Sequence, residues 1–167
     1  MKELADKLAA YLRVKLAAPD LAVRDLARIP GGASRETYRF RARYNSEGKP
    51  VDRGLILRRD PVASLIETER TTEYRAYDAF HKLGLPVPQP IALELSGGAL
   101  ERPFFIMAEV ENCTPGSIMN VEPYGEHRQK VGEQFYTVLG KIAAADPSSI
   151  GLGDFEGAKN VNHAAMH

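Results

Sequence analysis

Hydrophobic residues recur at helical spacing in three stretches of the chain. Leucine stands at every fourth position from Leu4 to Leu16, which predicts an amphipathic helix over residues 2–17, stopped before Pro19. Apolar residues three or four apart predict a second helix over 64–83 and a third that opens at Pro123. Their apolar positions are Ile66, Tyr77, Phe80 and Leu83 in the second helix, and Val131, Phe135, Val138 and Ile142 in the third.

Between the helices the pattern changes to the two-residue period of β-strands. Residues 36–44, "ETYRFRARY", alternate strictly, so the aromatic and alanine side chains face one way and Arg39, Arg41 and Arg43 face the other. Strands that follow one another through short turns favour an antiparallel sheet in an α+β fold. The predicted strands are 21–29, 36–44, 53–60, 90–95 and 103–110, with a loop at 45–52 and a Ser-Gly-Gly turn between the last two.

Composition and charge narrow the class of protein. The 167 residues are 44% hydrophobic and 26% charged, as in soluble globular domains. Lysine and arginine number 22, as do aspartate and glutamate, so no net charge favours nucleic acid or membrane, and any anion site must be local. The single cysteine, Cys113, suits a reducing compartment. The charged N-terminus does not resemble a signal peptide, and no apolar run could span a membrane, so we expect a cytoplasmic protein.

One candidate ion pair lies between a strand and the helix after it. Glu73 falls inside the apolar stripe of the predicted helix. Burying a carboxylate costs free energy unless a cation pairs with it. The preceding strand ends in "LILRRDP", where Arg58 points away from the face of Leu55 and Leu57. The sequence therefore predicts an Arg58–Glu73 pair and places Arg59 at the surface. The alternative is a Glu73 at the edge of the stripe, bonded to solvent.

Other patterns carry less information. "PGGAS" at 30–34 is a glycine-rich turn whose N–H groups are able to approach an anion, but such turns between strands are more often plain hairpin turns. The three arginines at 39, 41 and 43 are more typical of a solvated sheet face than of a nucleic-acid surface, because the aromatic residues point the other way. The histidines have no metal-ligand spacing, and "GDFEG" at 153–157 is not a kinase Asp-Phe-Gly motif.

Taken in order, these motifs resemble a known family. "GGASRETYRF", "LILRRDP", "TEYRAYDAFHKLGLPVPQPIAL" and "PFFIMAEVEN" are similar to the N-terminal lobe of the aminoglycoside phosphotransferase and choline-kinase-like family, which has a protein-kinase-like fold. The nearest branch is that of the phosphotransferase domains associated with acyl-CoA dehydrogenases. The resemblance covers about residues 20–155. It implies an N-terminal helix at 1–19, a nucleotide-binding lobe at 20–111, and at 112–167 the hinge exit and the start of an incomplete large lobe.

The resemblance also implies a role for each matching residue. Arg58 would contact the α- and β-phosphates of ATP, and Glu73 would orient it. The "MAEVE" segment at 107–111 would be the hinge, although the family's usual Glu/Asp-Gly is replaced here by "EVEN". The nucleotide-binding set is Gly31, Gly32, Ala33, Ser34 and Arg35 over the phosphates, then Arg58 and Glu73, and Met107, Ala108, Glu109 and Val110 at the adenine.

The family's catalytic loop is absent from this sequence. No His-x-Asp occurs in it, so no catalytic or metal-binding residue is assigned, and Mg²⁺ is expected only with the missing large lobe. We expect the ATP-binding lobe of a phosphotransferase acting on a hydroxyl group, catalytically incomplete as this fragment. The alternatives are a non-catalytic nucleotide- or protein-binding module and a structural remnant with no ligand. The expected partners are nucleotide, a small hydroxylated acceptor and, through the exposed lobe interface, further copies of the chain, but neither nucleic acid nor membrane. The acceptor and the choice between ATP and GTP are not encoded in these patterns.

Overall fold

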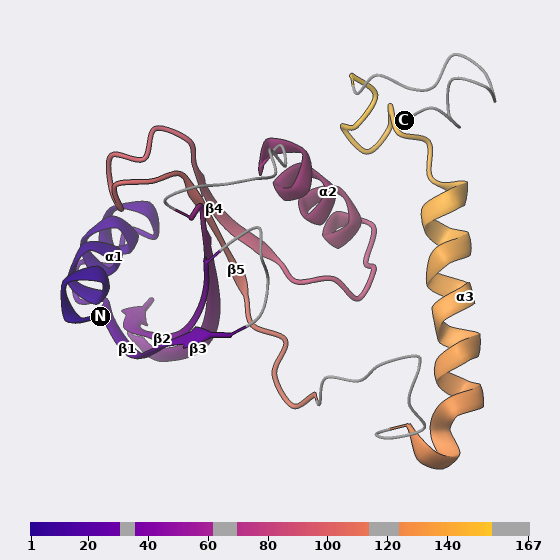
Figure 1. Cartoon of the computed structure of the whole chain (residues 1–167), viewed down its shortest axis with the longest axis horizontal. Helices are drawn as coiled ribbons and strands as arrows, with labels where there is room; N and C mark the ends of the chain where they lie inside the picture. Colours follow the sequence, from indigo (N-terminus) through magenta and orange to yellow (C-terminus); the bar gives the residue numbers. More distant parts are fainter. Residues whose placement is uncertain (31–35, 62–69, 114–123, 155–167) are drawn as a thin grey trace.

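The computed structural model describes residues 1–30, 36–61, 70–113 and 124–154. The elements follow the predicted order of one helix, three strands, a helix, two strands and a helix (Figure 1). The predicted α+β class and five-stranded antiparallel sheet are confirmed, with the strands in the order β1-β2-β3-β5-β4. The bounds are α1 Lys2–Lys15, β1 Ala22–Ile29, β2 Glu36–Ser46, β3 Lys49–Arg59, α2 Arg70–Lys82, β4 Pro90–Glu94, β5 Phe104–Ala108, a 3-10 turn η1 Gly125–His127 and α3 Arg128–Ala144.

The first face of the sheet forms the main core with α1. Leu8 and Leu12 of the predicted leucine stripe are fully buried, and Tyr11 meets Phe104 of β5 edge-on with ring centroids 5.0 Å apart. Strand β2 keeps its predicted alternation, because Phe40 and Ala42 are fully buried on this side. Burial of these apolar groups is the main source of stability for the lobe.

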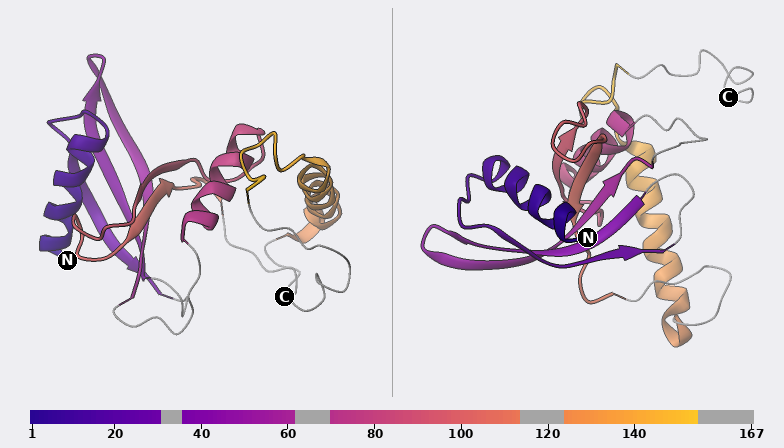
Figure 2. Two further views of the ribbon diagram at one scale, coloured as in Figure 1. Left: turned by 90° about the horizontal axis from the view of Figure 1, so that it is seen from above. Right: turned by 60° about the vertical axis from the view of Figure 1, so that its left-hand side comes forward.

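The opposite face of the sheet packs against α2. Phe105 is buried next to Phe104 but points to the other side, where its ring lies 6.2 Å from Tyr74 and 6.3 Å from Tyr77. The sheet therefore lies between α1 and α2 (Figure 2). The helix was predicted over 64–83; residues 62–69 lie outside the described part of the chain, and the helix ends at Lys82.

Leu83 was predicted to face the core and is instead exposed. The helix ends before it, and Gly84 adopts a φ of 70°, the left-handed conformation that commonly follows a helix C-terminus. This turn carries the chain back so that Leu85, rather than Leu83, is buried. Helical periodicity was extended one residue too far.

The first hairpin is tighter than predicted. Residues 45–52 were expected to form a loop, but β2 runs to Ser46 and β3 begins at Lys49. Only Glu47 and Gly48 make the turn, and both have positive φ, 53° and 76°. Two successive residues with positive φ are typical of the type I′ turn, whose twist matches that of paired strands. The polar residues of 45–52 and Pro50 suggested a loop, because the local composition does not show that this segment pairs with β2.

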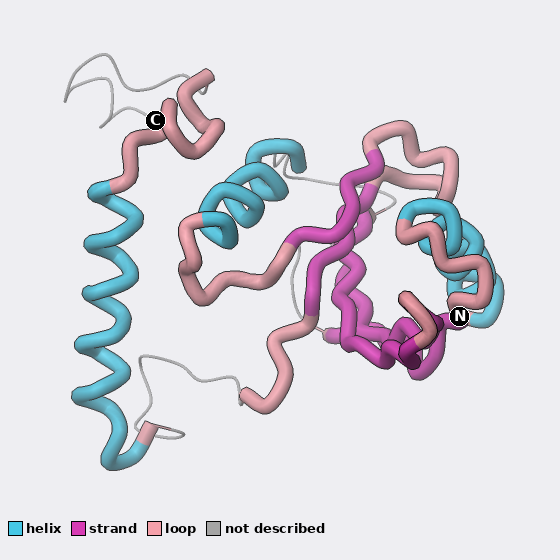
Figure 3. Tube along the Cα trace, turned by 180° about the vertical axis from the view of Figure 1, so that it is seen from behind, coloured by secondary structure: helices cyan, strands magenta, loops and turns pink. Residues whose placement is uncertain are grey.

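Helix α3 stands apart from the sheet (Figures 1 and 3). Its predicted start at Pro123 lies outside the described residues, and none of its described residues is buried. The side chain of Arg75 on α2 donates a 2.9 Å hydrogen bond to Asp154 beyond α3, and so links the two regions. Within the described residues, no helix combines the length and apolar character that crossing a membrane requires.

Candidate nucleotide-binding site

The predicted ion pair between β3 and α2 is confirmed. Nη1 of Arg58 donates to the Glu73 carboxylate, and both side chains are about one-fifth exposed. Arg58 points to the α2 face because it is out of phase with Leu55 and Leu57, which face α1. Its guanidinium carbon lies 5.5 Å from the centroid of the Phe105 ring, a distance that suits a cation–π contact.

Arg58 also carries an unused donor. Its Nε is buried and has no hydrogen-bond partner among the described residues. A guanidinium is always charged and its nitrogen atoms only donate, so a buried nitrogen without an acceptor costs free energy. The side chain is fixed by Glu73, and its exposed part is where an anion could bind.

Arg59 was predicted to lie at the surface, and this was wrong. It lies on the other side of the sheet from Arg58, but it is only 9% exposed. Its Nη2 donates a 2.7 Å hydrogen bond to Glu36, and its guanidinium carbon lies 5.7 Å from the centroid of the Tyr38 ring. Strand alternation explains this: Arg59 shares the phase of Leu55 and Leu57 and so enters the α1 face. The alternation that placed Arg58 on the α2 face would also have placed Arg59 on the α1 face.

The predicted hinge residues end β5 and follow it. Met107 and Ala108 close the strand, and the N–H of Ala108 donates to the Gln89 carbonyl at 2.8 Å. The N–H of Glu109 donates to the Gly54 carbonyl at 2.9 Å, so the hinge is still tied to β3 at this residue. Val110 is more than half exposed, and the chain leaves the sheet there. The binding of adenine to Ala108, Glu109 and Val110 stays a prediction.

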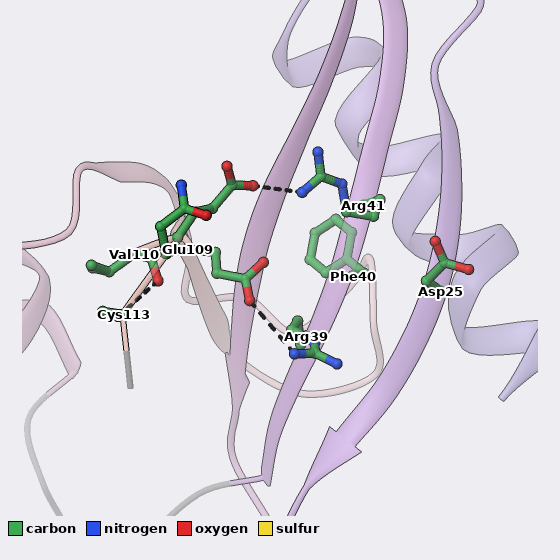
Figure 4. Close-up of a pocket in the computed structure, with 9 residues that line it drawn as sticks. Asp25, Arg39, Phe40, Arg41, Glu109, Val110 and Cys113 are labelled. Atoms are coloured by element: carbon green, nitrogen blue, oxygen red, sulfur yellow. Dashed lines mark hydrogen bonds and ion pairs between the residues drawn. The ribbon is translucent and has the colours of Figure 1, made fainter. Parts of the chain in front are cut away.

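Two hinge carboxylates lie against the sheet face that carries Arg39 and Arg41 (Figure 4). Glu111 pairs with Arg41 and accepts a 3.3 Å hydrogen bond from the Gly54 N–H, and Glu109 lies 3.9 Å from Arg39. A Cβ at Gly54 would stand 2.2 Å from Oε2 of Glu109, so glycine makes this approach possible. The concave region has a volume of about 630 Å³, lined by Asp25, Arg39, Phe40, Arg41, Glu109, Val110, Glu111, Asn112 and Cys113.

The arginine row on β2 was predicted to be a solvated face. Arg39 and Arg43 are more than half exposed, as predicted, and Arg41 is about one-third exposed. Arg41 and Arg43 both bond the Asp52 carboxylate at 2.7 Å. Each described member of the row therefore has a carboxylate partner, which neutralises much of its positive charge.

The predicted glycine turn lies between the end of β1 and the start of β2. Gly31, Gly32, Ala33, Ser34 and Arg35 lie outside the described residues. The strands on either side of it are paired, with Ile29 opposite Thr37, so both ends of the turn lie at the Arg58 end of the sheet, because Thr37 is also opposite Arg58. Among the described residues, no group of three or more His, Cys, Asp or Glu side chains is arranged to hold a metal ion.

Sequence reasoning missed the residues that surround Arg59. Glu36, Asp60 and Arg102 form polar contacts at the start of β2, the end of β3 and the β4–β5 connection. The phase of Glu36 on β2 matches that of the buried Phe40, and this was an available signal. Arg102 had none, because its position depends on how the turn between β4 and β5 folds back.

Comparison with known proteins identifies the family. The profile of the phosphotransferase enzyme family matches residues 25–164, most of the chain. The crystal structure of a putative aminoglycoside phosphotransferase from Ralstonia eutropha JMP134 has the same kinase-like fold, with a TM-score of 0.65 and 24% sequence identity. The match covers 93% of this chain and 42% of that one. The narrower likeness to domains associated with acyl-CoA dehydrogenases stays a prediction. On the family match, this chain belongs to the phosphotransferase enzyme family.

Proposed function

We propose that the chain is the ATP-binding lobe of a phosphotransferase that acts on a hydroxyl group of a small molecule. The observation that carries the proposal is the Arg58–Glu73 pair. Glu73 holds the guanidinium, and the Arg58 side chain remains about one-fifth exposed, as expected of a group that binds phosphate oxygens. In this proposal the segment 31–35 covers the phosphates, and the peptide groups of Ala108 to Val110 bond the adenine edge.

Phosphoryl transfer also requires groups that the described residues do not supply. The chemistry depends on in-line positioning, on metal ions that neutralise the phosphates, and on a carboxylate that orients the acceptor hydroxyl. The described residues offer no cluster of metal ligands, and the sequence has no His-x-Asp. We assign the base and the Mg²⁺ ligands to a large lobe that these 167 residues do not include. The role of this chain is then to bind and orient the donor.

The single cysteine offers a direct test of ATP binding. Cys113 is exposed, and it lines the concave region beside the hinge together with Glu109. We expect ATP to slow the alkylation of Cys113 by a maleimide, with an apparent Kd of about 0.1–1 mM because the metal ligands are absent. Arg58→Met should weaken ATP binding at least fivefold while leaving adenosine binding unchanged.

Arg43→Met is the matched control, since it removes the same charge from the same sheet face at a more exposed position. It should leave the effect of ATP within twofold of wild type. The proposal fails if ATP does not protect Cys113 at a concentration about ten times the upper end of the expected Kd range. It also fails if the two variants lose affinity for ATP equally. Equal loss would mean that the arginines act only through net charge.

A further inference from the structure

A connected set of ion pairs lies at the Arg58 end of the sheet, on the α1 side. Its centre is Glu36, the first residue of β2, whose side chain is only 15% exposed. The carboxylate accepts a 2.7 Å hydrogen bond from Nη2 of Arg59 and a 3.2 Å bond from Nη2 of Arg102. The hydroxyl of Tyr38 donates to the same oxygen at 3.2 Å. One carboxylate thus joins β2, β3 and the β4–β5 connection.

Arg102 extends this set toward α2. Its Nη1 donates a 2.7 Å hydrogen bond to the Asp60 carbonyl, just beyond the end of β3. The Asp60 carboxylate pairs with Arg70, whose Nε lies 3.1 Å from Oδ1. Arg70 is the first residue of α2. The path Glu36–Arg102–Asp60–Arg70 therefore connects the start of β2 to the start of α2.

The two ends of this path adjoin the groups that the proposed function assigns to the phosphates. Glu36 directly follows the segment 31–35. Arg70 lies one helical turn before Glu73, which pairs with Arg58. The side chain of Arg102 itself points to Glu36 and Asp60 rather than to Arg58. Its position fits a group that acts on the phosphate site only through others.

We propose that Arg102 is a positioning residue for nucleotide phosphates. This role rests on the proposed function. Arg102 holds the start of β2, the end of β3 and the first turn of α2 in one arrangement. The planar guanidinium suits this task because two of its nitrogen atoms reach two acceptors at once. A lysine in its place has a single nitrogen and would keep the charge without the same bridge.

Hydrogen exchange tests the positioning role without any nucleotide. In Arg102→Met, we expect the amides of residues 74–80 in α2 to exchange at least threefold faster, because Asp60, which pairs with Arg70, loses the hydrogen bond that Arg102 donates to its carbonyl. The amides of 43–51, at the far end of the first hairpin, should be unchanged. Glu101→Gln is the matched control: this neighbour pairs with Lys7 of α1 and lies outside the path. Unchanged exchange in α2 would overturn the proposal.

Measurements of nucleotide affinity then test whether Arg102 supports binding of the phosphates. We expect Arg102→Met to raise the Kd for ATP at least fivefold and the Kd for adenosine less than twofold. Arg102→Lys should fall between Arg102→Met and wild type, and Glu101→Gln should match wild type. An unchanged Kd for ATP overturns the proposal, and so does an equal loss for ATP and adenosine, which a general loss of structure would give. If wild type binds neither ligand, the proposed function itself fails, and the exchange data still decide whether Arg102 holds α2.

Discussion

Glu36 keeps its negative charge in a site that is mostly enclosed by protein. Burial acts to raise its pKa, but the hydrogen bonds from Arg59 and Arg102, together with their positive charges, outweigh burial and lower the pKa below its ordinary value of 4.5. A carboxyl group whose pKa is lower in the folded chain than in the unfolded chain stabilises the fold above the unfolded pKa. That stabilisation is lost as the pH falls through the folded pKa.

Replacing Glu36 with glutamine should therefore cost more stability at neutral pH than in acid. At pH 7 we expect Glu36→Gln to lower the free energy of unfolding by about 1.5–3 kcal/mol, the usual range for hydrogen bonds to charged groups. The difference from wild type should shrink as the pH falls through the folded pKa of Glu36, which lies below 4.5, because the wild-type carboxyl then also becomes protonated. Urea denaturation at both pH values measures this. An exposed acid, as in Glu126→Gln, should show no such dependence, and an equal gap at both pH values would contradict the assignment.

At the scale of elements, the first hairpin depends on its two-residue turn. Gly48 has a φ of 76°, and nothing lies within 4 Å of where its Cβ would be. The cost of a side chain there is therefore one of backbone conformation, about 1–2 kcal/mol for an L-residue in the left-handed region. We expect Gly48→Ala to lower the free energy of unfolding by about that amount.

Gly98→Ala, in the turn between β4 and β5, is the control for this prediction. Gly98 does not have positive φ, and a Cβ there would meet only Ser96 Oγ at 3.5 Å, an ordinary contact. Thermal unfolding followed by circular dichroism compares the two variants. If both lose the same stability, the left-handed conformation of Gly48 is not the cause.

How well the sequence predicted each element depended on how local its signal was. The alternation of β2 and the leucine stripe of α1 were sufficient for the class of fold and for the Arg58–Glu73 pair. The same patterns did not reveal that Pro50 lies inside a strand, because its environment comes from pairing with Asn45 on β2. Arg102 was missed for a similar reason, since its partners Glu36 and Asp60 are 66 and 42 residues away in sequence.

At the scale of the whole molecule, α3 presents an uncovered apolar surface. Phe135, Tyr136 and Leu139 are 59%, 72% and 49% exposed. Clustered exposed apolar residues favour association, whereas single ones are common on any surface. We expect the 167-residue chain to self-associate at micromolar concentrations in sedimentation velocity, and Phe135→Ser combined with Leu139→Ser to shift it toward monomer. Val14→Ser, an isolated exposed residue on α1, should have no effect, and an equal shift with it would refute the role of α3.

The second prediction at this scale concerns catalysis. We expect the chain alone to transfer no phosphoryl group from ATP in the presence of Mg²⁺ to amino alcohols or sugars, because binding of the ground state alone does not lower the chemical barrier. Labelled ATP and a panel of acceptors provide the assay. Turnover above background that disappears in Arg58→Ala would show that an essential carboxylate lies within these residues, and the assignment of the base to another lobe would have to be abandoned.

The opposite directions of Arg58 and Arg59 have a consequence for insertions and deletions. Neighbouring residues of a strand face opposite sides, so shifting β3 by a single position would send Arg59 toward Glu73 and Arg58 into the layer between the sheet and α1. A deletion would bring Arg59 to the place of Arg58 and Asp60 to the place of Arg59, whereas an insertion would bring Leu57 and Arg58 to those two places. Loss or gain of one codon between Val51 and Leu57 is therefore expected to be far more damaging than most substitutions there. A deletion scan of β3 would reveal this dependence on the alternation of side chains, which single substitutions do not detect.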